Sequence, residues 1–178
     1  YGYISEANLG YRYGKGSWVA ITGTSGLGEE IAQCFAKRGF NVLQLGRNPM
    51  DLSEYPNIET KFIECHFERS HEIGFFDKIE QEFRSVDLSC LVNNVASRSG
   101  SMEYENMDQN TIKNTIVVGT FPQAILTQLA IKNFKKRPKT LTSAIVDVTS
   151  LCTTSTDLLN MDPTITVPHI GVYEGANS

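Results

Sequence analysis

Short apolar runs alternate with longer amphipathic stretches along the chain. The runs of strand-forming residues lie at 18–21, 41–45, 61–65, 88–92 and 144–148. Between them, apolar residues recur at steps of three and four, which is the spacing of one face of a helix. Alternating strands and helices predict a Rossmann-type, doubly wound parallel sheet with helices on both faces. Right-handed crossovers would place the first and fourth strands side by side, with a crevice at their carboxyl ends.

Three helical patterns define the expected covering layers. The apolar face of the first consists of Leu27, Ile31, Cys34 and Phe35. The second, over 71–83, carries a stripe formed by Ile73, Phe76, Ile79 and Phe83. The third runs over 107–134 and contains Pro122, where we expect a kink or a break. Residues 1–16 lack periodicity and are expected to form an extended N-terminal arm, with the domain proper at 17–178.

A glycine-rich turn follows the first strand. Gly23, Gly26 and Gly28 lie within six residues, with Ser25 and Leu27 between them. Glycine is needed where a turn is tight and where a side chain would block a pyrophosphate, and the following helix N-terminus attracts that anion. Strand, glycine turn and helix together predict a dinucleotide site. A turn that only packs is the alternative.

Arg47 stands just past the second strand. In this architecture that position faces the adenosine ribose, where a cation favours NADP and an acidic residue favours NAD. An exposed loop arginine without this role is the alternative.

Composition narrows the classes of function. The chain has 178 residues, 40% of them hydrophobic, and a net charge of −4, which argues against nucleic acid as the main partner.

A cationic run is formed by Lys132, Lys135, Lys136, Arg137 and Lys139. We expect a solvated helix end there, with a partner contact as the alternative. No apolar run reaches membrane-spanning length, and the absence of an initiator Met suggests a processed, trimmed or partial chain.

The cysteines and histidines do not predict a metal site. Cys34, Cys65 and Cys90 fall in expected core elements and should be buried free thiols. His66 and His71 have no third ligand nearby.

Taken in order from Gly14 onward, the motifs resemble the short-chain dehydrogenase/reductase family, in particular its very-long-chain 3-ketoacyl reductase and hydroxysteroid dehydrogenase branch. The matching pieces are the turn at 22–28, Arg47, the segment 91–95, the segment 148–150 and the pair 172–173. The resemblance implies hydride transfer between NADP(H) and a carbonyl or alcohol. It implies nucleotide contacts at Gly23, Ser25, Gly26, Leu27, Gly28, Arg47, Asn93 and Asn94.

The resemblance also implies a catalytic set, which this chain matches in part. Tyr173 and Ser150 match the catalytic Tyr and Ser. Asn114 matches the helical Asn in one alignment, and Gly119 takes that place in another. Asn177 stands where the family has a Lys, and a neutral amide cannot lower the pKa of the neighbouring phenol.

The chain also departs from the family's pattern at the nucleotide-binding end and at the catalytic end of the expected site. The glycine turn is one residue shorter than the family's, and His66 replaces an Asp expected against the adenine. Tyr173 follows Ser150 by 23 positions, whereas both must reach one substrate oxygen and the family keeps about a dozen. The chain ends just as the helix that carries Tyr173 begins, so the C-terminal strands of the fold are missing from it.

These departures favour a catalytically impaired member of the family, a pseudoenzyme that acts as a structural accessory subunit of a larger complex. Two alternatives stay open: an active NADPH-dependent 3-ketoacyl or steroid reductase, and an NADP(H) sensor without turnover. The expected partners are other protein subunits, without nucleic acid and without direct membrane insertion. The location is expected to be intracellular, in a mitochondrial assembly or at the endoplasmic reticulum. Whether NADP(H) is bound or absent remains open at this point.

Overall fold

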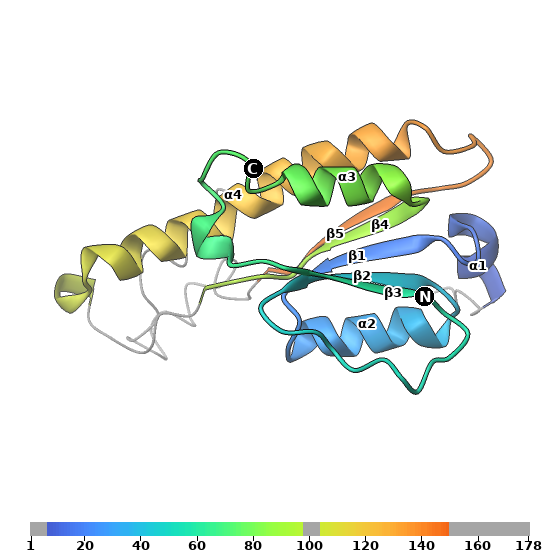
Figure 1. The fold of residues 1–178 in the computed structure, drawn as a ribbon, viewed down its shortest axis with the longest axis horizontal. Helices are drawn as coiled ribbons and strands as arrows, with labels where there is room; N and C mark the ends of the chain where they lie inside the picture. The colour runs from blue at the N-terminus through green and yellow to red at the C-terminus, as the bar shows by residue number, and fades with distance from the viewer. Residues whose placement is uncertain (1–6, 98–103, 150–178) are drawn as a thin grey trace, which may run out of the picture.

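A five-stranded parallel sheet forms the centre of the computed structural model, which describes residues 7–97 and 104–149 (Figure 1). The strands are β1 Trp18–Thr22, β2 Asn41–Gly46, β3 Thr60–Glu64, β4 Leu88–Asn93 and β5 Ala144–Asp147. Their order is β3-β2-β1-β4-β5, and every adjacent pair is parallel. The predicted doubly wound sheet is confirmed, with β1 beside β4 and all carboxyl ends at one edge.

Helices cover both faces of this sheet, as Figure 1 shows. Helix α2 (Leu27–Lys37) lies on one face, and α3 (Asp77–Ser85) and α4 (Gln109–Phe134) lie on the other. Two short 3-10 turns, η1 (Phe67–Arg69) and η2 (Tyr104–Asn106), complete the connections. In β1, Trp18 and Ala20 belong to one core cluster and Val19 and Ile21 to the other. This alternation gives the sheet an apolar core on each side, because successive strand side chains point to opposite faces.

The buried face of α2 differs from the predicted one. Its fully buried positions are Gly28, Ala32 and Ala36, spaced by four, whereas Leu27 is 56% exposed. Cys34, expected in the core, is also exposed. Small residues allow the helix backbone to approach the sheet closely, so the large apolar residues lie beside the contact line rather than on it.

The second predicted helix begins later than expected. α3 starts at Asp77, because Gly74 adopts a positive φ of 82° that interrupts helical geometry. Ile73 therefore lies in the preceding turn and is fully exposed, so its place in the apolar stripe was predicted wrongly. Ile79 and Phe83 are buried as predicted.

Helix α4 continues through Pro122 without a break. The proline is buried against the core, and tertiary packing there outweighs the backbone hydrogen bond that proline cannot make. Within residues 7–97 and 104–149, no helix combines the length and the apolar character that a bilayer crossing requires.

The N-terminal segment is helical rather than extended from Ala7 to Tyr13, which form α1. Leu9 and Tyr13 pack against the core cluster that faces α2. The main chain of this helix is also held, because Thr142 N donates to Arg12 O at 2.8 Å. The described part of the arm is therefore integrated into the domain.

Arg137 lies inside the protein instead of on a solvated helix end, and its side chain is only 4% exposed. Its guanidinium donates to both carboxylate oxygens of Asp87, at 2.6 and 3.2 Å. It also donates to Tyr13 O and Thr142 O, each at 2.5 Å, and to Ser143 Oγ at 3.2 Å. One side chain thus joins the ends of α1, α3 and α4 at the amino edge of the sheet.

Candidate functional site

The glycine turn closes the carboxyl end of β1. Gly23 and Gly26 have φ values of 79° and 57°, where a residue with a side chain would be strained. A Cβ on Gly28 would overlap the carbonyl oxygen of Gly23, so the helix and the turn are in backbone contact. A Cβ on Gly26, by contrast, would meet nothing within 4 Å. Gly26 therefore presents bare backbone to open space, as a site for a close-approaching ligand requires.

Asn94 holds this turn from the neighbouring strand. Its Nδ2 donates to Thr22 O at 3.0 Å and to Gly23 O at 3.3 Å. The Asn94 and Val95 amides donate to Thr22 Oγ1 at 2.9 and 3.0 Å. A Cβ on Gly28 would lie 2.6 Å from Asn94 Nδ2. Asn94, predicted to contact the nucleotide, thus bonds to the backbone of the turn. Thr22 supports the turn as well, although it was not among the predicted nucleotide contacts.

The amino end of α2 carries no side-chain cap. Within the described residues, the amides of Leu27 and Gly28 make no hydrogen bond. Unpaired first-turn amides and the positive end of the helix dipole favour an anion. Glu29 and Glu30 also lie in this first turn, where their charge stabilises the helix but opposes an added anion.

A cation stands at the adjacent corner of the site. β2 ends at Gly46, and the exposed Arg47 follows directly. Arg47 forms no ion pair with any residue in the two described ranges. The structure thus places the predicted turn residues and Arg47 at the same edge of the sheet.

Asn93 supports the edge where β4 and β5 end. It is 6% exposed, and its Nδ2 donates to Asp147 Oδ1 at 2.8 Å and to Thr127 Oγ1 at 3.2 Å. Val148 N donates to Asn93 O at 2.9 Å. Asn93 therefore links β4, β5 and α4, and its described contacts are with protein atoms.

Of the predicted catalytic residues, the structure describes only Asn114. Asn114 is half-buried in the first half of α4, as is Gly119, and Asn114 makes no hydrogen bond within the described residues. Ser150, Tyr173 and Asn177 lie outside the described residues. Their assignment stays a prediction from the resemblance.

Histidine and cysteine side chains in this part of the sheet have other surroundings. His66 is exposed and bonded through Nε2 to Glu64 Oε1 at 2.9 Å. Burial raises the pKa of the Cys65 and Cys90 thiols to about 12. No cluster of three or more potential metal ligands occurs within residues 7–97 and 104–149.

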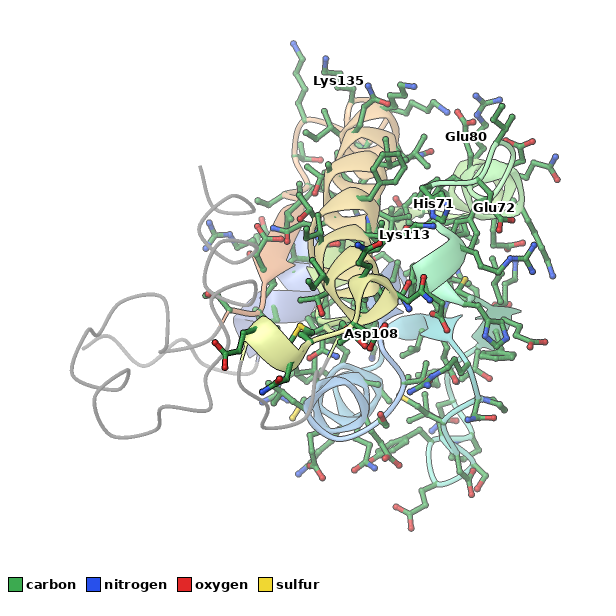
Figure 2. The ribbon with its side chains drawn as sticks, turned by 90° about the vertical axis from the view of Figure 1, so that its left-hand side faces the viewer. His71, Glu72, Glu80, Asp108, Lys113 and Lys135 are labelled. Carbon is green, nitrogen blue, oxygen red and sulfur yellow. The ribbon has the colours of Figure 1, made fainter. Side chains whose placement is uncertain are left out.

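Charged side chains around the start of α4 form a separate, exposed cluster (Figure 2). Asp108 caps the helix by accepting from the Asn110 and Thr111 amides, each at 3.0 Å, and hydrogen bonds from Thr111 lower its pKa. Lys113 follows, beside the turn that carries Glu72. These contacts order the helix end and belong to the surface of the α3–α4 face.

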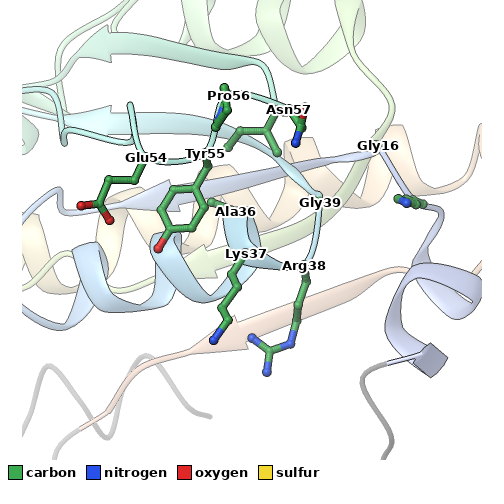
Figure 3. A pocket seen from close by; sticks show the side chains of 11 residues that line it. Gly16, Ala36, Lys37, Arg38, Gly39, Glu54, Tyr55, Pro56 and Asn57 are labelled. Atoms are coloured by element: carbon green, nitrogen blue, oxygen red, sulfur yellow. The ribbon is translucent and has the colours of Figure 1, made fainter.

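A groove of about 450 Å³ lies at the opposite, amino edge of the sheet. Lys37 and Arg38 at the end of α2 line one side, and Glu54 and Tyr55 of the β2–β3 connection line the other (Figure 3). The Arg38 guanidinium donates to Cys34 O at 2.8 Å, which satisfies a terminal helix carbonyl. The groove is remote from the glycine turn, so we place the candidate site at the turn, where the backbone is open.

Comparison with known proteins identifies the family of the chain. The family model "short chain dehydrogenase" matches residues 17–157. The very-long-chain 3-oxoacyl-CoA reductase of Bos taurus is 31% identical over 158 residues, which cover 80% of this chain and 48% of that protein. The enzyme of the same name from Coccidioides immitis is 28% identical over 71% of this chain and 39% of its own length. The chain spans less than half the length of these relatives.

Solved structures support the fold. A 3-oxoacyl (acyl-carrier-protein) reductase from Agrobacterium tumefaciens with NADP bound superposes with a TM-score of 0.73 at 16% identity, over 98% of this chain and 66% of that one. A bulky-bulky ketone specific alcohol dehydrogenase from Comamonas testosteroni gives 0.72 at 18% identity, over 90% and 63%.

The predicted resemblance to the ketoacyl reductase branch is confirmed. The match over residues 17–157, together with the parallel sheet and the glycine turn, shows that this chain belongs to the short-chain dehydrogenase family.

Proposed function

We propose that the chain carries the nucleotide-binding part of a short-chain dehydrogenase that binds NADP(H) and is impaired in hydride transfer. The observation that carries the binding proposal is the turn itself. Gly26 faces open space, and the Leu27 and Gly28 amides are unpaired in the described structure. These groups would hold a pyrophosphate, and Arg47 would hold the 2′-phosphate that distinguishes NADP from NAD. NADPH, when bound, supplies the hydride for carbonyl reduction.

The proposal of impaired catalysis comes from Tyr173 and its surroundings in the sequence. A phenol, with a pKa near 10, transfers a proton poorly at neutral pH unless a neighbouring cation favours its ionised form. Asn177, four residues on, is neutral, and Glu174 beside the tyrosine adds negative charge that opposes ionisation. Without that cation the hydroxyl is a weak general acid, so the slow step is proton delivery.

Gly26→Ala tests the binding half of the proposal. Fluorescence titration with NADPH should show saturable binding to the wild-type chain, and the variant should lose at least tenfold in affinity because a Cβ blocks the approach to the backbone. Gly16→Ala is the matched control. Gly16 also has a positive φ, of 78°, and open space around its Cβ, but it lies at the amino edge of the sheet.

Both glycine variants carry the same kind of backbone strain, about 1 kcal/mol. Equal losses of affinity in the two would show that strain, rather than a blocked site, is responsible. Binding that is unaffected by Gly26→Ala would contradict placement of the pyrophosphate at this turn.

An active reductase is the second candidate, favoured by the similarity to very-long-chain 3-oxoacyl-CoA reductases. The assay is NADPH oxidation with a long-chain 3-oxoacyl-CoA. If the wild-type chain turns over and Tyr173→Phe abolishes that turnover, the chain is an active reductase and the proposal of impaired catalysis is wrong. The accessory-subunit role is the companion proposal to impairment, and it requires co-purification with other subunits in a fixed ratio.

A further inference from the structure

Exposed lysines gather at the amino edge of the sheet, opposite the glycine turn. The ends of α1, α2 and α4 all lie at this edge (Figure 1). The lysines come from these helix ends and from the segments that follow them, and they are Lys15, Lys37, Lys132, Lys135, Lys136 and Lys139. None of them forms an ion pair with a residue that the structure describes. The amino edge therefore carries uncompensated positive charge, although the whole chain has a net charge of −4.

Acidic side chains on the neighbouring elements already have other cationic partners. Glu82 of α3 pairs with Lys61, and Asp87 before β4 pairs with Arg137. The segment 130–143, which holds the end of α4 and the loop after it, contains no acidic residue. Protein surfaces normally intersperse charges of both signs, so a run of one sign without internal partners indicates a surface for an anionic partner.

The separate groups of lysines are connected around α1. A Cβ on Gly14 would lie 3.1 Å from Arg137 Nη2, so the residue before Lys15 abuts the segment that follows α4. A Cβ on Gly39 would lie 3.5 Å from Lys15 Cε, and Gly16 N donates to Gly39 O at 3.2 Å. Lys15 thus joins the end of α4 to the end of α2. We call the exposed lysines along this path the basic strip.

The groove in Figure 3 lies on the basic strip. Lys15 and Lys37 line this groove of about 450 Å³, and the half-buried Tyr55 and Ile58 add apolar surface to it. Glu54 is the only carboxylate among its described lining residues. A flat anionic surface such as a membrane cannot enter a concave groove, whereas the side chains of a peptide can. Charge and shape together therefore favour an acidic peptide segment.

From this arrangement we infer that the basic strip and its groove dock an acidic segment of a partner protein. The carboxylates of that segment pair with the lysines, and its side chains enter the groove. Docking there goes beyond the proposed function and is independent of nucleotide binding, because the strip and the glycine turn lie at opposite edges of the sheet.

A fluorescently labelled octaglutamate peptide is the probe, because it supplies the negative charge without other recognition elements. Fluorescence anisotropy should show saturable binding to the full chain, and the affinity should fall as the NaCl concentration rises. The double variant Lys15→Gln/Lys37→Gln should bind about tenfold more weakly, because it removes two charges beside the groove. Both lysines are exposed, so the circular dichroism spectrum should match that of the wild type.

Lys78→Gln/Lys113→Gln is the matched control. Both lysines are exposed, on α3 and α4, and their replacement removes the same total charge. Equal losses in the two double variants overturn the inference, because they show attraction by net charge rather than docking at the strip. A wild-type chain that does not bind octaglutamate also overturns it, and binding instead to vesicles of phosphatidylserine and phosphatidylcholine in equal parts would assign the strip to a membrane surface. Loss confined to the Lys15→Gln/Lys37→Gln variant supports the inference.

Discussion

At the scale of single residues, the site separates groups that hold the backbone from groups that remain unpaired. Asn94 and Thr22 use their polar atoms on the turn, whereas Arg47 and the Gly28 amide have no partner in the described structure. The motif predicted a set of site positions, and the described ones lie at the carboxyl edge of the sheet. It could not separate supporting from binding residues, because that depends on strands far apart in the sequence.

Burial of two thiols leads to an alkaline sensitivity of the fold. In the unfolded chain Cys65 and Cys90 lose their protons near the ordinary value of 9.0, but in the folded chain burial keeps them protonated until about pH 12. The unfolded state therefore binds fewer protons between these values, and stability that is fully present below pH 9 falls as the pH rises.

The measurement is urea unfolding at pH 8 and pH 10. The loss of stability between the two should be smaller in Cys65→Ala and Cys90→Ala than in wild type, relative to each variant's own stability at pH 8. Cys34→Ala is the control, because Cys34 is exposed. Identical pH dependence in all four proteins would contradict the role of thiol burial.

At the scale of elements, packing decided where helices begin and which face they bury. α2 approaches the sheet through Gly28, Ala32 and Ala36. The face predicted from the larger apolar residues was therefore not the face that the helix buries. The start of α3 depends on Gly74, whose positive φ was not readable from periodicity. The strands were predicted more accurately, because continuous apolar runs in a sheet covered on both faces leave little freedom in register.

Arg137 should be the most sensitive member of its cationic run. Arg137→Lys keeps the charge but cannot reproduce the fork that joins α1, Asp87 and the loop before β5, so we expect a loss of about 3 kcal/mol in unfolding free energy. Lys136→Ala, an exposed neighbour, should change it by less than about 0.5 kcal/mol. Urea denaturation compares them, and equal effects would show that Arg137 is not a structural link.

At the scale of the whole molecule, the sheet order brings the ends of β1, β2 and β4 to one edge. Gly23, Arg47 and Asn94 come from three separate strand ends, and parallel pairing through right-handed crossovers makes them neighbours. The same order sends the groove lined by Lys37 and Tyr55 to the opposite edge. We therefore expect substitutions at the carboxyl edge to leave the packing at the amino edge unchanged.

Nucleotide binding should stabilise the entire domain by mass action. At a hundred times the Kd, NADPH should add about 2.7 kcal/mol, which corresponds to a Tm increase of about 5–10 °C in a chain of this size. NADH at the same concentration should give a smaller increase, and Gly26→Ala should remove the NADPH effect. Thermal unfolding followed by circular dichroism measures this, and equal shifts from the two nucleotides would contradict the role of Arg47.

Local pattern alone determined the alternation of strands and helices, the position of the glycine turn and the membership of the family, because each depends on residues close together in the chain. Tertiary structure alone decided that Thr24 lies over Gly46 and that Arg137 is buried. It also decided that Asn93 and Asn94 bond to the protein itself. The physical reason is that burial and hydrogen-bond pairing are set by neighbours that come from distant strands, and no local spacing encodes which neighbours those are.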